Sequence, residues 1–221
     1  MKKVFLSLVA VAVMVVMAYA AADIRNTKHN LASWSTNDYK SSNYSEICVF
    51  CHTPHAASAW PLWNRNYTAG TFTFYSTLTF DANATSLDET SKLCFSCHEN
   101  ANTWSTTTLK NPSNLVNNAA PTFNHVNIRS TAALGTDLRD DHPVGFNMAA
   151  LNTTKYPEVY SMNQISTNFG GDSVTDLFPN GQFTCGSCHD VHGKKVGATV
   201  IPVLLRRSNA SSLLCLSCHA K

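Results

Sequence analysis

Long periodic runs of apolar positions are scarce along this chain. The one extended apolar stretch runs from Val4 to Met17, directly after Lys2 and Lys3. Beyond it, apolar residues occur in short groups among Asn, Ser and Thr, and no long amphipathic helix is indicated. Residues 71–80 alternate in part between aromatic and polar side chains, which predicts a short strand. We therefore predict a mostly irregular fold with short α-helices and little sheet.

The apolar stretch at the start has the features of a secretory signal. Two lysines, an apolar centre and the small-residue sequence Ala18-Tyr19-Ala20 follow one another in the order that such signals require. We predict a signal peptide over residues 1–20, with cleavage after Ala20 or Ala22, and a single domain over residues 21–221. An uncleaved anchor is the alternative, because the apolar stretch just reaches membrane-spanning length. The Ala-rich end favours cleavage, so no stable membrane anchor is expected.

Charge excludes one class of partner. Charged residues make up 14% of the chain, against about 25% in average domains. Lys and Arg number 16 and Asp and Glu 14, so loss of Lys2 and Lys3 leaves a neutral polypeptide. Arg206-Arg207 and Lys194-Lys195 are short pairs rather than a basic patch. No nucleic-acid partner is therefore expected.

A five-residue motif, Cys-x-x-Cys-His, occurs four times and uses all eight cysteines. The cysteine pairs, in chain order, are Cys48 and Cys51, Cys94 and Cys97, Cys185 and Cys188, and Cys215 and Cys218. The histidines that complete the four motifs are His52, His98, His189 and His219. Below, the motifs are called first to fourth in this order.

The motif is the attachment signature of a c-type haem. Two thiols add to one porphyrin, and the next residue turns its imidazole onto the iron; one helical turn brings all three groups to the same side. Zinc sites and disulfides also use paired cysteines, but neither requires a His after every second Cys. We predict four covalently attached haem c groups. With about 50 residues per haem, the porphyrins must supply most of the core.

Second axial ligands have to come from the remaining histidines. Nine His less the four in the motifs leaves five, whereas only Met148 and Met162 remain after signal removal. Two methionines cannot complete four sites, so bis-histidine ligation is predicted; it gives a lower reduction potential than His/Met ligation. The candidates are His29, His55, His125, His142 and His192.

Two of these candidates belong to an internal repeat. The first and third motifs continue to a second His three residues on, His55 and His192, while the second and fourth both read Leu-Cys-x-Ser-Cys-His. A His three residues beyond another shares its helical face and cannot reach the opposite side of the same haem. A neighbouring, closely packed haem is its expected target. His142 lies in Asp140-Asp141-His142-Pro143, where the carboxylates can accept its ring N–H or stay solvated.

Several segments together resemble a known group, the doubled-CxxCH multihaem cytochromes. They are Cys48-Val-Phe-Cys-His-Thr-Pro-His55, Pro61-Leu-Trp-Asn-Arg65, Asp141-His-Pro-Val-Gly-Phe146, Cys185-Gly-Ser-Cys-His-Asp-Val-His-Gly193 and Leu214-Cys-Leu-Ser-Cys-His219. Within that group the chain is most similar to the tetrahaem extracellular cytochromes of the OmcE type, which polymerise into conductive filaments. The likeness spans nearly the whole mature chain.

The resemblance implies bis-His irons, with one axial His supplied by the adjacent subunit. The matching candidate is His29, on an N-terminal arm suited to crossing an interface. His125 matches no position of the group and is taken as the spare. A head-to-tail contact of this kind builds an open filament when its rotation does not close a ring.

These expectations favour an electron-transfer protein rather than an enzyme. Closed ligation leaves no open iron position for a substrate. The expected product is an exported homopolymer, extracellular or at the cell surface, that passes electrons to other redox proteins or external acceptors. The alternative is a non-polymeric tetrahaem carrier, either periplasmic or membrane-anchored.

Overall fold

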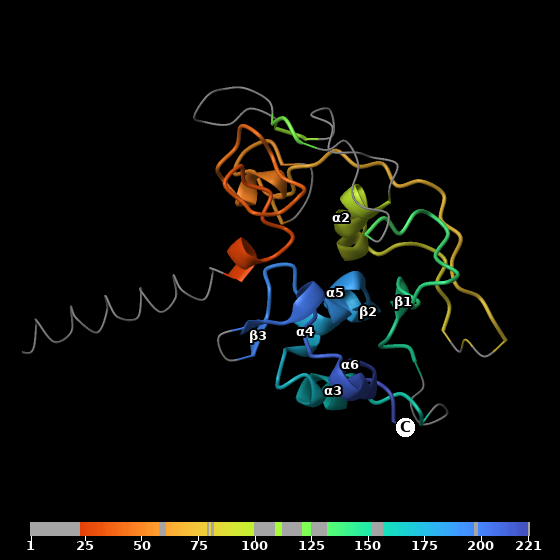
Figure 1. Ribbon diagram of the computed structural model, residues 1–221. Helices are drawn as coiled ribbons and strands as arrows, with labels where there is room; N and C mark the ends of the chain where they lie inside the picture. The colour runs from red at the N-terminus through yellow and green to blue at the C-terminus, as the bar shows by residue number, and fades with distance from the viewer. Residues whose placement is uncertain are drawn as a thin grey trace, which may run out of the picture.

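The fold consists of short helices joined by long irregular connections (Figure 1). The computed structural model describes residues 23–57, 61–78, 80, 82–99, 109–111, 121–124, 132–151, 157–196 and 199–220. The predicted signal peptide, its cleavage site and His125 lie outside these residues. The predicted fold class, mostly irregular with little sheet, is confirmed within the described chain.

Each motif coincides with a helical turn. The first begins the 3₁₀ turn η2 (Cys48–Phe50), and the second ends α2 (Glu89–His98). The third is α5 (Cys185–Cys188), and the fourth begins within α6 (Leu213–Leu216). The remaining helical elements are η1 (Asp23–Asn26), α3 (Met162–Asn168), α4 (Val174–Leu177), η4 (Pro179–Gly181), η5 (Pro202–Leu204) and η6 (Ala210–Ser212).

Two small antiparallel sheets complete the regular structure of the described residues. β1 (Phe146–Asn147) pairs with β2 (Gln182–Phe183), with Phe146 opposite Phe183. β3 (Lys195–Val196) pairs with β4 (Thr199–Val200). The first sheet ends just before α5 and so fixes the entry into the third motif.

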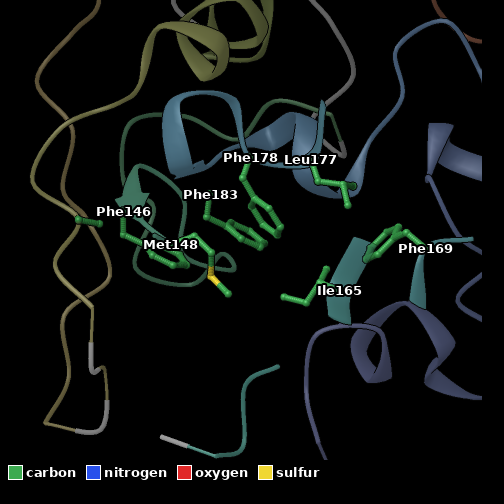
Figure 2. Packing of buried hydrophobic residues seen from close by; sticks show 8 residues of the cluster. Phe146, Met148, Ile165, Phe169, Leu177, Phe178 and Phe183 are labelled. Carbon is green, nitrogen blue, oxygen red and sulfur yellow. The ribbon is translucent and has the colours of Figure 1, made fainter. Parts of the chain in front are cut away.

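Apolar side chains form three separate clusters instead of one core. The largest gathers residues from β1, β2, α3 and α4 around Phe183, and Figure 2 shows these side chains turned toward one another. It contacts Cys188 and Cys218, so it supports the third and fourth motifs. A second cluster around Phe50 holds the first motif, and a third around Phe95 holds the second.

The strand predicted over residues 71–80 is wrong. Its described residues make only one bridge, between Thr73 and Asp137. Packing overrides the alternation, because Phe72 meets Phe95 with ring centroids 5.0 Å apart while Phe80 meets Phe146 at 5.8 Å. The segment therefore joins two clusters and lacks a strand partner along most of its length.

None of the described helices combines the length and apolarity needed to cross a bilayer.

Candidate haem-binding sites

The backbone of each motif brings its two cysteines and its histidine into one turn. In the three motifs outside α2, the His backbone N–H donates to the carbonyl of the first Cys. The donor–acceptor distances are 2.8 Å for His52 to Cys48, 3.1 Å for His189 to Cys185 and 2.9 Å for His219 to Cys215. All eight cysteines lie in the described chain as free thiols. The arrangement presents two sulfurs and one imidazole to a common ligand.

Serine hydroxyls tighten three of the four motifs. The residue before the second Cys is Ser96, Ser187 or Ser217, and each of these side chains is buried. Their hydroxyls donate to backbone carbonyls at 2.6 Å, 2.5 Å and 2.7 Å respectively. A buried hydroxyl with a carbonyl partner incurs no desolvation penalty. This explains the repeated Ser that the sequence displays in Leu-Cys-x-Ser-Cys-His.

A short extended segment, here called a strap, runs antiparallel to three of the motifs. The first strap is residues 61–64, the third is 203–206 and the fourth is 157–160, numbered by the motif that each one faces. Isolated bridges join His52 to Trp63, His189 to Leu205 and Val159 to His219.

The hydrogen bonds of the three straps are equivalent. The last strap residue donates its N–H to the carbonyl of the second Cys: Asn64 to Cys51 (2.8 Å), Arg206 to Cys188 (2.8 Å) and Tyr160 to Cys218 (2.9 Å). In return, the residue after the motif His donates its N–H to the strap carbonyl two positions earlier, at 2.7–2.9 Å. The straps therefore hold the three motifs in one common geometry.

Backbone carbonyls orient the motif imidazoles. Nδ1 of His52 lies 2.8 Å from the Pro61 carbonyl, and Nδ1 of His189 lies 3.0 Å from the Val203 carbonyl. In the second motif, Nδ1 of His98 lies 2.6 Å from the Ala132 carbonyl. A carbonyl can only accept, so Nδ1 carries the proton and Nε2 keeps its lone pair. This is the tautomer and the orientation that a metal-ligating imidazole needs.

Three motif histidines face a second imidazole at nearly the same separation. Ring centroids lie 6.3 Å apart for His52 and His192, 6.2 Å for His98 and His29, and 6.5 Å for His219 and His142. Two imidazoles on opposite sides of one metal, with metal–nitrogen bonds of about 2.0–2.1 Å and ring nitrogens about 1.1 Å from the centroids, lie about 6.3 Å apart. The three pairs therefore fit two axial ligands of one iron.

His29 meets His98 within the same chain. Burial lowers the pKa of His29 to about 4, nearby His98 lowers it further, and a hydrogen bond to the Val191 carbonyl opposes both effects. The ring is therefore neutral at pH 7, the state that binds a metal. Because Val191 lies between the third-motif His189 and His192, the N-terminal segment is fastened to the loop after the third motif.

The surroundings of His142 differ from the first expectation. Its Nδ1 lies 3.0 Å from the Pro143 carbonyl rather than against a carboxylate. The ring stacks on Phe183, with centroids 5.2 Å apart and planes at 30°. The large apolar cluster thus orients His142 toward the fourth motif. Partial burial, with Asp140 nearby, raises the pKa of Asp141.

Two candidate histidines have no such partner ring among the described residues. His55 is exposed, and His189 faces no second histidine ring at a comparable distance in the part of the chain that the structure describes. His125 lies outside the described residues. Over those same residues, no three or more His, Cys, Asp or Glu side chains converge as ligands of a metal ion.

The thiols of successive motifs lie close to one another. Cys94 of the second motif is hydrogen-bonded to Cys185 of the third, and this contact raises the pKa of the Cys94 thiol. Burial, with Cys97 nearby, raises the pKa of Cys51 to about 12. Burial raises the pKa of Cys218 to about 12 as well, and Cys188 adds to the effect. The motifs therefore follow one another in space in their sequence order.

Residues 178–221, which include the third and fourth motifs, match the family model described as the doubled CXXCH motif. No curated protein matches the chain significantly. The family match supports a multihaem c-type cytochrome, a class that transfers electrons and carries haem covalently on such motifs. When bound, a haem supplies an iron that accepts and releases one electron. The chain supplies the thiols that attach it and the imidazoles that face its iron.

Sequence reasoning found every cysteine and histidine of these sites but none of the straps. Straps act through backbone carbonyls and N–H groups, which any residue carries. One weak signal was available: a proline, Pro61, Pro157 or Pro202, stands at or just before the start of each strap. Proline favours an extended neighbour and provides no N–H of its own.

Proposed function

We propose that the chain binds four haem c groups, one at each motif, and transfers electrons through them as a bis-His cytochrome. The separation of the His52–His192, His98–His29 and His219–His142 pairs carries this proposal. The proposed pairs serve the first, second and fourth haems.

His189 and His55 are the remaining predicted ligands, and we assign them to the third haem. The repeat supports this choice. His192, three residues after His189, faces the first motif, so the reciprocal partner of His189 is His55, three residues after His52. His125 then remains the spare histidine.

The haem number is tested on the exported protein after denaturation. Intact mass should exceed the polypeptide mass by four haem groups, and acid-acetone should leave the pigment on the protein. Proteolysis should yield a haem-bearing peptide for every motif. Release of the pigment, or a mass increase below four haems, would contradict the proposal.

Ligation at both axial positions makes a substrate-binding role unlikely to be the function of any of these irons, and we propose an electron carrier rather than an enzyme. All four ferric irons should be low-spin in electron paramagnetic resonance spectra. Cyanide and nitrite should bind slowly or not at all. A high-spin iron that binds either ligand rapidly would favour a reductase.

We further propose that the protein is exported and polymerises into an extracellular filament. Resemblance to the filament-forming tetrahaem cytochromes is the main support. A second support is the exposure of Cys48 and Cys215, at the two ends of the series of motifs, while the other six cysteines are partly covered. Haems at these two ends would be accessible to a donor, an acceptor or another subunit.

Negative-stain microscopy of the secreted fraction tests the filament. Fully loaded particles that stay monomeric would favour a discrete carrier, and a retained Met1–Ala22 segment would favour an anchored one. Dissociated subunits also decide the role of His29. An intrachain ligand leaves every iron low-spin in the monomer, whereas a ligand from the adjacent subunit leaves one iron high-spin after dissociation.

A further inference from the structure

Asn64 and Arg206 occupy the same position in two equivalent straps. Both donate their backbone N–H to the carbonyl of the second Cys, as described above. Both also donate a side-chain N–H to the carbonyl of the residue that follows the first Cys: Asn64 Nδ2 to Val49 and Arg206 Nε to Gly186, each at 2.6 Å. The two side chains thus fasten the first and third motifs in the same way, but only Arg206 is charged.

The fourth strap carries a neutral side chain at this position as well. Tyr160 makes the same backbone hydrogen bond to Cys218. Among the three straps, therefore, the third alone places a positive charge beside its motif. The hydrogen bonds alone do not require that charge, because an amide at the first motif makes the equivalent bond.

Arg206 belongs to a small, partly buried group of charges. Its Nη1 lies 3.4 Å from Asp172 Oδ2, and the side chains of Arg206 and Asp172 are only 16% and 18% exposed. Lys194 pairs with the other oxygen of Asp172 and also donates to the Phe169 carbonyl at 3.2 Å. Two cations and one anion leave one net positive charge. At this degree of burial, solvent and salt screen that charge only in part.

The motif histidine senses this charge. Partial burial is the main cause that lowers the pKa of His189, and Arg206 contributes to the lowering. A positive group that disfavours a proton on the imidazole also disfavours the extra positive charge of a ferric iron bound to it.

We propose that Arg206 raises the reduction potential of the haem on the third motif relative to the haem on the first, where Asn64 occupies the equivalent position. The inference rests on the proposed haem attachment at Cys185 and Cys188. Reduction adds one electron and removes one positive charge from the iron centre. A neighbouring cation therefore stabilises the reduced form, and its removal favours the oxidised form.

The decisive variant is Arg206→Asn, which installs the residue of the first strap in the third. It keeps a side-chain N–H for the Gly186 carbonyl and removes the charge. Individual haems are followed during a redox titration by their hyperfine-shifted methyl signals in NMR spectra. We expect the reduction equilibrium constant of one haem to fall about fivefold to tenfold, which corresponds to about 40–60 mV.

Three further variants separate charge from structure. Asp172→Asn leaves a net charge of two and should raise the same potential. Arg206→Lys keeps the charge and should restore most of the wild-type value. Arg207→Asn removes the same charge from the neighbouring residue, which makes no ion pair with any described residue, and should shift no haem comparably.

Each result supports or overturns the inference. It is overturned if Arg206→Asn shifts no single haem, if Arg207→Asn has the same effect, or if Asp172→Asn lowers the potential. Haem on the peptide containing Cys185 and Cys188 is verified first by mass. An unmodified peptide refutes the proposed haem attachment itself, whereas a modified peptide with an unchanged potential refutes only the role of Arg206.

Discussion

The rings of His52 and His192 lie almost parallel, with planes 17° apart and centroids 6.3 Å apart. His52 belongs to the first motif, whereas His192 follows the third. The pair therefore joins two motifs that are far apart in the sequence. Its separation fits one iron with an imidazole on each side.

Replacing His192 with Ala should leave the first iron with one imidazole. One of the four proposed low-spin ferric signals should be replaced by a high-spin signal, and added imidazole should restore it. Electron paramagnetic resonance of the exported protein measures this directly. His125→Ala is the matched control, and its spectrum should match the wild type. An unchanged spectrum for His192→Ala would contradict the assigned pair.

Removing the side chain of Asn64 should destabilise the first motif. Asn64 is 1% exposed, and its amide bonds both the Val49 carbonyl and the backbone of Asn111. Asn64→Ala leaves these buried groups without partners and should cost about 2–4 kcal/mol of unfolding free energy. Chemical denaturation of the loaded protein provides the measurement. Asn163→Ala, at an exposed position in α3, should change stability by less than about 0.5 kcal/mol.

Gly145 cannot carry a side chain without a backbone collision. Its φ is +79°, and an added Cβ would lie 2.4 Å from the Ser86 carbonyl oxygen. Gly145→Ala should therefore lower the unfolding free energy by about 3 kcal/mol or more, since left-handed backbone alone costs about 1–2 kcal/mol. Gly135 is the matched control because its φ is +75° and no atom lies within 4 Å of an added Cβ. Equal losses in the two variants would show that the contact with Ser86 is unimportant.

The N-cap of α2 gives a local test of the second motif. The Asp88 side chain accepts a hydrogen bond from the Ser91 N–H at 2.8 Å, which satisfies a free donor at the start of the helix. Asp88→Ala should cost about 1 kcal/mol. Asp88→Ser should recover most of that loss in the same thermal unfolding assay. If both variants unfold at the same temperature, the cap does not support the helix.

Sequence reasoning succeeded where chemistry depends on side-chain type. Cysteine and histidine have few substitutes in the Cys-x-x-Cys-His pattern, and short helical turns follow from its spacing. It failed over residues 71–80, because Phe72 and Phe80 respond to packing partners from distant segments rather than to their own alternation. It also missed the straps, because the carbonyls of Pro61 and Val203 leave no specific trace in the sequence.

Which imidazole faces which motif depends on long-range folding. Spacing shows that His192 cannot serve its own motif from the same helical face, but it does not name the motif that His192 faces. The contact between His29 and His98 likewise depends on how the N-terminal segment crosses the loop after the third motif.

The pairing of His52 with His192 also imposes an order on maturation. A chain exported from its N-terminus presents the first motif long before its proposed second ligand has left the cytoplasm. Pigment attached early must wait with an incomplete coordination sphere until translocation is nearly finished. A chain truncated before His192 would be coloured yet would expose an iron to peroxide and other small oxidants.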